Sequence, residues 1–160
     1  MMIKQIHEAE LGVCAEVIKS SFMTVAEELN ITEQNSPGYV AFSTTKEKLK
    51  NRIQSGGQIY AYIKENKILG LYSINISHNE CEISNLCVLE DYRHNGIGRK
   101  LLEHAFSKAT ESGCKTIKIS IVEENVRLKK WYESYGFKPQ YTKKYDFFAF
   151  TCGYMKKELQ

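Results

Sequence analysis

The stretch Arg93-His94-Asn95-Gly96-Ile97-Gly98 decides the fold, because it lies between a strand-like run at residues 81–89 and a helix-like run at residues 99–112. Its two glycines allow the backbone to approach a ligand without obstruction by a Cβ atom. The helix that follows would direct unpaired N–H groups and its positive dipole end at an anion. With its own arginine and the following Arg99 and Lys100, the stretch predicts a phosphate-binding loop.

The glycine spacing excludes two common nucleotide-binding loops. A dinucleotide fingerprint needs a third glycine where Leu101 stands, and a Walker loop needs a Gly-Lys-Ser/Thr sequence that does not follow. The spacing instead resembles the Arg/Gln-x-x-Gly-x-Gly/Ala loop that cradles the pyrophosphate of coenzyme A in the GNAT superfamily of N-acetyltransferases. A glycine-bearing helix start without a ligand is the alternative for so short a pattern.

A second stretch decides between these alternatives. Asn125-Val126-Arg127-Leu128-Lys129-Lys130-Trp131-Tyr132-Glu133-Ser134-Tyr135-Gly136-Phe137 resembles the second signature of the same superfamily, an asparagine that opens a helix ending in Tyr-x-x-x-Gly-Phe. A helix and an alternating strand at residues 116–122 separate the two signatures. The resemblance spans roughly residues 74–157 and implies an α/β fold with a mixed, mostly antiparallel sheet of six to seven strands. Helices would cover both faces, and a central βαβα unit would bind the cofactor.

Hydrophobic periodicity and turn residues predict the remaining elements. A stripe of apolar residues from Leu11 to Phe22 indicates a helix, and Thr44 with Glu47 forms a capping-box pattern for a helix that extends to about Gln54. The predicted strands lie at residues 3–6, 58–63, 68–77, 80–88, 116–122, 140–146 and 147–155.

Two later helices have well-defined apolar faces and glycine stops. Gly113 would end the first helix and Gly136 the second. The expected core residues of the first are Ile97, Leu101, Leu102, Ala105 and Ala109, and those of the second are Leu128, Trp131, Tyr132 and Tyr135.

Composition predicts one domain over residues 1–160, because the length is ordinary for a domain and 42% hydrophobic content suffices for a core. A formal charge of +3 with dispersed lysines argues against nucleic acid as a partner. The absence of an apolar signal segment or membrane span predicts a cytoplasmic protein without a membrane partner. Five cysteines without a Cys-x-x-Cys pair and four scattered histidines suggest reduced thiols and no metal site. A homodimer is left open.

The resemblance implies acetyl-CoA as acyl donor, without a metal. A main-chain N–H on the strand before the loop would stabilise the oxyanion. Asn125 would contact the pantetheine arm, although it would also be a good helix N-cap without any ligand. The residues expected at the cofactor are therefore Leu86, Cys87, Val88, Arg93, His94, Asn95, Gly96, Ile97, Gly98, Arg99, Lys100, Asn125 and Tyr132. Cys87 is interpreted as a small buried side chain rather than a nucleophile.

Tyr132 and Glu82 are the expected catalytic residues. The phenol of Tyr132 matches the family's acid, which protonates the departing thiolate, while a core aromatic is the alternative and Tyr135 the weaker contender. Glu82 stands where several relatives carry a catalytic glutamate, and strand alternation places it on one face with Glu80 and Ser84. It would act directly or through water, and a solvent-facing acid is the alternative.

The resemblance therefore implies transfer of an acetyl group from acetyl-CoA to a primary amine by direct attack in a ternary complex. A non-catalytic acyl-CoA-binding sensor is the main alternative, and a structural or nucleic-acid-binding domain is a third. The acceptor would be bound at about residues 21–39 and 141–150, which contain no recognisable motif. The acidic residues Glu27, Glu28 and Glu33 give weak support for a polyamine, because such a run is usually a solvated helix face.

Overall fold

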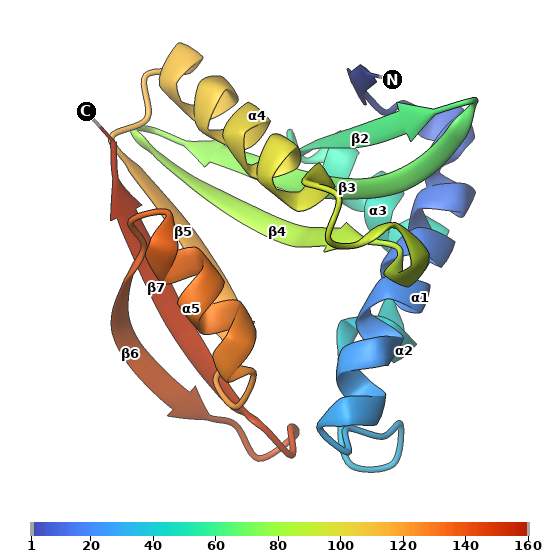
Figure 1. Cartoon of the computed structure of the whole chain (residues 1–160), viewed down its shortest axis with the longest axis vertical. Helices are drawn as coiled ribbons and strands as arrows, with labels where there is room; N and C mark the ends of the chain where they lie inside the picture. Colours follow the sequence, from blue (N-terminus) through green and yellow to red (C-terminus); the bar gives the residue numbers. More distant parts are fainter. Residues whose placement is uncertain (1, 160) are drawn as a thin grey trace.

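The computed structural model describes residues 2–159 and contains a seven-stranded sheet in the order β1-β2-β3-β4-β5-β7-β6 (Figure 1). Only β4 and β5 run parallel, and all other neighbouring strands are antiparallel. The mixed, mostly antiparallel α/β sheet expected from the sequence is confirmed. The strands are β1 (Met2–Gln5), β2 (Gln58–Lys64), β3 (Lys67–Ser77), β4 (Glu80–Val88), β5 (Thr116–Val122), β6 (Lys138–Lys144) and β7 (Thr151–Glu158).

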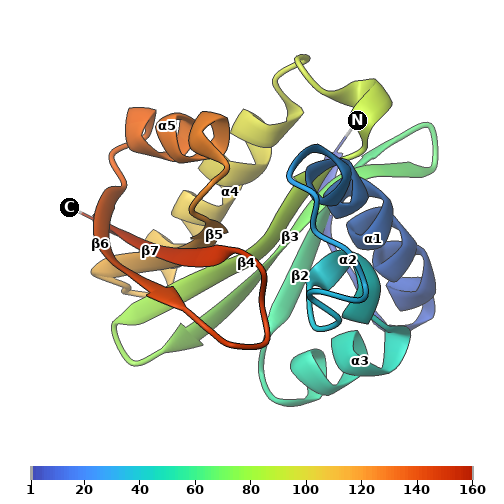
Figure 2. The same cartoon turned by 90° about the horizontal axis from the view of Figure 1, so that it is seen from below.

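Helices cover both faces of the sheet (Figure 2). One face packs against α1 and α3, and the opposite face packs against α4 and α5, each with its own apolar core. The helices are α1 (Leu11–Glu28), α2 (Val40–Ser43), α3 (Lys46–Gln54), α4 (Ile97–Glu111) and α5 (Val126–Ser134), with short 3₁₀ helices at Glu8–Glu10 and Glu90–Tyr92. The apolar stripe of each helix determines which of its faces packs against the sheet.

The stripes predicted for the two later helices are present. The buried residues of α4 are those expected from the 3.6-residue period: Ile97, Leu101, Leu102, Ala105 and Ala109. In α5 only Tyr132 is fully buried, while Leu128, Trp131 and Tyr135 pack half-buried against the same core. Gly113 and Gly136 follow the two helices with φ of 79° and 96°, as expected of helix stops.

The parallel strands β4 and β5 diverge along their length, as Figure 1 shows. Their pairing extends only from Glu80 to Glu82 on β4. Beyond it, a bulge adds one residue to β4, because its partners on β3 shift between Ser84 and Cys87. Asn85 lies in this bulge with φ of 58°. Since a bulge bends its strand, β4 turns away from β5 and leaves an opening between them.

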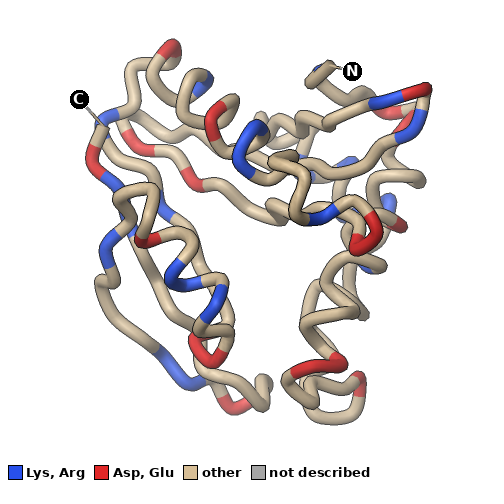
Figure 3. The backbone as a smooth tube through the Cα atoms, in the orientation of Figure 1, with Lys and Arg blue, Asp and Glu red and all other residues tan. Residues whose placement is uncertain are grey.

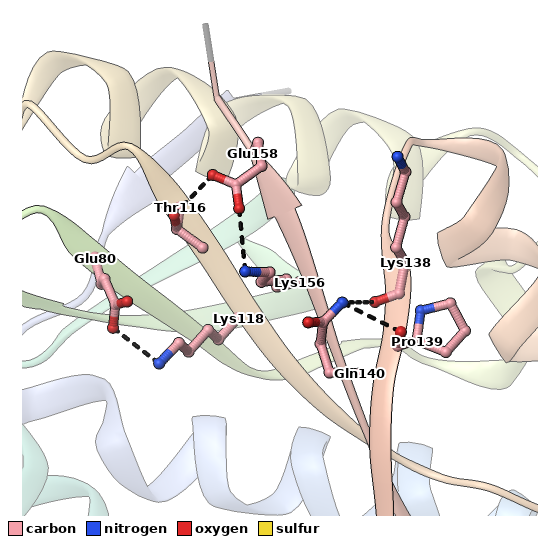
Figure 4. A network of polar contacts seen from close by, with 8 residues as sticks. All are labelled: Glu80, Thr116, Lys118, Lys138, Pro139, Gln140, Lys156 and Glu158. Carbon is pink, nitrogen blue, oxygen red and sulfur yellow. Dashed lines mark hydrogen bonds and ion pairs between the residues drawn. The ribbon is translucent and has the colours of Figure 1, made fainter.

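Polar contacts fasten the end at which β4 and β5 meet (Figure 4). Lys118 on β5 forms an ion pair of 2.9 Å with Glu80 on β4. On the next strand, β7, Glu158 accepts a hydrogen bond of 3.1 Å from Thr116 and pairs with Lys156 at 3.3 Å. Such exposed pairs contribute little to stability, so the backbone ladder sets the geometry and the side chains complement it.

Two sequence predictions need correction. The N-cap of α3 is Thr45, whose hydroxyl accepts a hydrogen bond from the Lys48 N–H at 3.1 Å, rather than Thr44. Thr44 is buried, and its hydroxyl donates to the Val40 carbonyl at 2.6 Å, which completes α2 instead. The sequence prediction placed the N-cap of α3 one residue too early, because the two adjacent threonines have the same capping side chain.

The last hairpin also differs from the prediction. Residues 145–150, which were assigned to the two strands, form a loop, and the strands start at Lys138 and Thr151. The Ala149 N–H donates to the Ser36 hydroxyl at 2.9 Å, and Phe150 packs on Tyr39. Contacts with a distant segment, between α1 and α2, therefore replace the local strand pairing that an aromatic run favours.

Charged residues are spread over the surface, with basic residues along α5 and β6 (Figure 3). Within residues 2–159, no cluster of three or more histidine, cysteine, aspartate or glutamate residues has a geometry that would hold a metal ion. All five cysteines are free thiols. Among the described helices, none is both long and apolar enough to cross a bilayer.

Candidate active site

A pocket of about 300 Å³ lies in the opening between β4 and β5. Its walls come from residues 83–86 of β4 and 119–122 of β5, and α5 contributes Asn125, Leu128 and Tyr132 at one end. The other end is lined by residues of α1, the α1–α2 connection, α3 and the loop before β7. The bulge in β4 therefore opens the space that the cavity occupies, and residues from both faces of the sheet line it.

The glycine loop stands at the end of β4 and leads into α4. Gly96 has a φ of 79°, which a residue with a Cβ adopts only with strain, and it serves as the N-cap of α4 without a side-chain hydrogen bond. Within residues 2–159, the backbone N–H groups of residues 94–99 have no hydrogen-bond acceptor. A helix start with free N–H groups and no capping side chain fits a phosphate group.

The second glycine is explained by space rather than by conformation. A Cβ on Gly98 would lie 3.6 Å from the Trp131 ring and 3.9 Å from Val88, which are ordinary contact distances. The protein alone would therefore tolerate alanine at this position. Because Gly98 has no Cβ, a small recess remains between the start of α4 and the indole ring of Trp131 on α5. A ligand group could fill this recess.

Arg93 does not direct its guanidinium at the loop. Its Nε donates to the Val88 carbonyl at 2.9 Å, one Nη donates to the Thr24 hydroxyl, and the other donates to the Ser21 carbonyl, both at 2.9 Å. The arginine of the motif thus ties the end of β4 to α1. It supports the loop from the side of α1. The sequence interpretation had instead treated Arg93 as a cation that contacts the phosphate.

The other two cations of the loop lie on the first turn of α4. Arg99 is exposed and approaches Glu103 at 3.7 Å, while the ammonium of Lys100 lies 5.9 Å from the centre of the Tyr62 ring. Exposed pairs of this kind are weak. Arg99 can therefore leave Glu103 for an anionic ligand at little cost.

Tyr132 is 5% exposed, and its ring packs edge-on against Trp131 and Phe137. Its hydroxyl, at the pocket wall, has no hydrogen-bond partner among residues 2–159. Burial, with a smaller effect of the neighbouring Cys87 thiol, raises the pKa of Tyr132 above its usual value. The phenol therefore stays protonated at neutral pH, as an available hydrogen-bond donor inside the pocket.

Asn125 and the end of β4 complete this side of the pocket. The Asn125 side chain accepts a hydrogen bond of 3.3 Å from the Leu128 N–H, so it caps α5 while it lines the pocket. Leu86 also lines the pocket, whereas burial raises the pKa of the Cys87 thiol to about 12. A thiol with so high a pKa is a poor nucleophile, which agrees with the interpretation of Cys87 as a packing residue.

Glu82 lies outside this pocket. It lines a separate polar depression of about 450 Å³ on the α3 side of the sheet, together with Glu80 and Lys118. Its carboxylate accepts a long hydrogen bond of 3.5 Å from Ser84, and Ser84 lines the main pocket. A hydrogen bond therefore links Glu82 in the polar depression to Ser84 in the main pocket. Any action of Glu82 on a ligand in the main pocket would pass through Ser84 or water.

The sequence interpretation missed Arg52, and it expected the acceptor at about residues 21–39 and 141–150 without singling out the aromatic residues of these segments. Arg52 extends from the last turn of α3, and Phe22, Tyr39, Phe148 and Phe150 come from segments that are far apart in the chain. Arginine in a helix and aromatics in a polar segment are common, so no local pattern marked them. Only the folding of residues 22–52 against residues 148–150 gathers them.

Residues 25–137 match the model of the Acetyltransferase (GNAT) family, and the chain belongs to this family. Solved structures share its fold over nearly the whole chain. An N-acetyltransferase, PaiA, from Thermoplasma acidophilum, solved with coenzyme A, has a TM-score of 0.83 at 22% identity and covers 99% of this chain and 100% of its own.

Two further structures are similar. The ribosomal-protein-S18-alanine N-acetyltransferase of Escherichia coli has a TM-score of 0.80 at 16% identity, over 99% of this chain and 94% of its own. The putative acetyltransferase YncA of Salmonella typhimurium, solved with acetyl-CoA, has a TM-score of 0.76 at 17% identity, over 100% of this chain and 94% of its own. These similarities confirm the fold, in agreement with the prediction from the two signatures.

Proposed function

We propose that this protein transfers the acetyl group of acetyl-CoA to a primary amine, in a ternary complex. The observation that carries the proposal is the pocket in the opening between β4 and β5, which Tyr132 lines, beside the strand whose end leads through the glycine loop into the uncapped start of α4. Membership in the acetyltransferase family and the coenzyme A bound to the Thermoplasma acidophilum protein support the choice of donor.

On the donor side, the N–H groups of residues 94–99 would hold the pyrophosphate, and the recess at Gly98 would admit it close to the backbone. Arg99 and Lys100 would add positive charge. The pantetheine arm would then lie between α5 and the end of β4, within reach of Asn125. Free main-chain groups along residues 83–88, which have no ladder partner on β5, would stabilise the oxyanion.

The proton transfers are assigned to two residues. Tyr132 would donate a hydrogen bond to the departing sulfur. Because burial raises its pKa, complete transfer of the proton to a thiolate is uphill, so stabilisation of the sulfur by this hydrogen bond is the larger contribution. Glu82 would receive the proton of the amine through Ser84 or water.

A panel assay tests the proposal. Free thiol released from acetyl-CoA is followed with amines of several classes, and coenzyme A is titrated separately by calorimetry. We expect turnover with at least one class of primary amine and binding of coenzyme A. Binding without turnover on any amine would instead support a non-catalytic acyl-CoA sensor, and the absence of both would refute the proposal.

A further inference from the structure

The end of the pocket away from α5 is strongly apolar. It is lined by Phe22, Val25, Tyr39, Val40, Phe148 and Phe150. Tyr39 packs on Phe150 with ring centres 5.4 Å apart, and Phe148 stacks on Phe150 at 4.6 Å. Burial raises the pKa of Tyr39 above its usual value, which is consistent with a dry wall. This end therefore favours a ligand with an apolar body.

Among the described residues that line the pocket, Arg52 is the one with a charged side chain, and none carries a carboxylate. Its Nη1 donates to the Ser73 hydroxyl at 3.1 Å. Ser73 pairs with Ser84 on β4, next to the bulge, and both Arg52 and Ser84 line the pocket, so the guanidinium is held beside the part of β4 that forms the pocket wall.

Most of the N–H donors of the Arg52 guanidinium have no partner in the part of the chain that the structure describes. Within residues 2–159, no carboxylate approaches its guanidinium within 4.0 Å, and Ser73 is its one hydrogen-bond acceptor. Burial lowers the pKa of Arg52, and the more distant Glu82 only partly opposes this effect. A half-buried cation with several free N–H groups is costly unless an anion joins it, and a carboxylate matches its forked geometry.

We propose that the acetyl acceptor is a hydrophobic amino acid or a close analogue, whose carboxylate binds Arg52 and whose side chain contacts the aromatic wall. This inference rests on the proposed acetyltransferase function and names the substrate class for the same site. A polyamine does not fit, because Arg52 would repel it. The acidic residues Glu27, Glu28 and Glu33 are all exposed and lie outside the pocket lining.

The reaction balances without a further reagent. The neutral amine nitrogen attacks the thioester carbonyl, a C–N bond forms and the C–S bond breaks. The ammonium form of the amine loses two protons in all. One proton leaves to solvent by way of Ser84 and Glu82, and the other ends on the sulfur of coenzyme A. The products are an N-acetylamino acid and free coenzyme A.

The test compares three acceptors at saturating acetyl-CoA: L-phenylalanine, phenethylamine, which lacks only the carboxylate, and spermidine. We expect kcat/KM for phenylalanine to exceed that for phenethylamine by about 10- to 100-fold, the range of one charge-assisted contact. Spermidine should be the poorest acceptor. The wild-type comparison requires no variant, so it does not depend on how a mutant folds.

Arg52→Gln should reduce the phenylalanine-to-phenethylamine ratio to near one, and Arg52→Lys should restore part of it. Lys48→Gln serves as the matched control, because Lys48 is an exposed cation on the same helix and does not line the pocket. Its ratio should equal that of the wild type. Comparison of this ratio between each variant and the wild type cancels differences in intrinsic reactivity between the two amines, because the same factor enters both ratios.

Each other outcome has a defined meaning. Equal or better turnover of phenethylamine or spermidine by the wild type would overturn the proposed acceptor and leave the acetyltransferase function intact. The same holds if Arg52→Gln keeps the wild-type ratio. If no amine is acetylated although coenzyme A binds in the calorimeter, both the acceptor and the proposed function fail.

Discussion

The guanidinium of Arg93 and the hydroxyl of Thr24, 69 positions apart in the sequence, are joined by a hydrogen bond of 2.9 Å. The same guanidinium holds the carbonyls of Val88 and Ser21. One side chain thus connects the end of β4, the glycine loop and the middle of α1. The position of the loop therefore depends on this connection.

Replacement of Arg93 by methionine should lower the free energy of unfolding by about 2–3 kcal/mol, because three hydrogen bonds of a half-buried cation are lost together. Arg93→Lys should recover only part, since an ammonium cannot reproduce the fork. Urea denaturation measures the change. Arg99→Met, at an exposed position, is the control and should change the stability by less than about 0.5 kcal/mol. An Arg93→Met protein of normal stability would contradict this assignment.

Gly96 and Gly98 should respond differently to alanine. Gly96→Ala should cost about 1 kcal/mol of stability or more, because φ at this position is 79°. Gly98→Ala should fold with normal stability, since its Cβ meets only ordinary contacts, but its affinity for coenzyme A should fall at least about tenfold. Calorimetric titration and thermal unfolding of both variants separate the two effects. Unchanged affinity in Gly98→Ala would argue against the loop as the pyrophosphate site.

Tyr132→Phe removes one hydroxyl that has no hydrogen-bond partner among residues 2–159. We expect kcat to fall by roughly 10- to 10³-fold with little change in KM for acetyl-CoA or in melting temperature. Tyr135→Phe, at the C-cap of α5 three residues further on, is the control and should keep normal turnover. If Tyr132→Phe retains kcat within about twofold of the wild type, the departing sulfur is stabilised by another residue or by solvent.

Glu82→Gln should lower kcat by on the order of 10²-fold, most strongly at low pH, where the acceptor amine is largely protonated and needs a base. Ser84→Ala should give a smaller loss of the same kind, because water can replace the serine in the path from the pocket to Glu82. The pH–rate profiles of both variants test this path. A Glu82→Gln enzyme with the wild-type profile would show that Glu82 is uninvolved.

The buried thiols predict a pH dependence of labelling and stability. Burial raises the pKa values of Cys14, Cys81 and Cys87 to about 12, so their thiolate fractions at pH 8 are very small. An alkylating reagent followed by mass spectrometry should label the less buried Cys152 first and the other three only after unfolding.

The same shifts fix the direction of the stability change with pH. An unfolded thiol ionises near pH 8.5 and the folded one does not, so the unfolded state binds fewer protons above that pH. The free energy of unfolding should therefore fall as pH rises from about 8.5 toward 12. Rapid labelling of all thiols in the native protein, or stability that rises over this interval, would contradict the burial.

Some features followed from the sequence because they depend on local periodicity and on residues with special backbone conformations. The bounds of β4 and β5 matched the prediction, and so did the apolar stripe of α4, since alternation and the 3.6-residue period identify one buried face. Gly96, Gly113 and Gly136 adopt the positive φ expected of a loop and two helix stops. Asn125 also caps α5 as predicted.

Tertiary structure decided the rest, because it brings together residues that no local pattern connects. The divergence of β4 from β5 depends on a bulge at Asn85, where neither glycine nor proline marks the turn. Arg93 matched a motif, but its three acceptors direct it toward α1 rather than toward the loop. Arg52 lines the pocket and donates a hydrogen bond to Ser73 on β3, while the local sequence around it is that of an ordinary polar helix. The residues expected to bind the acceptor are therefore positioned by long-range hydrogen bonds and burial. Local backbone preferences do not determine these contacts.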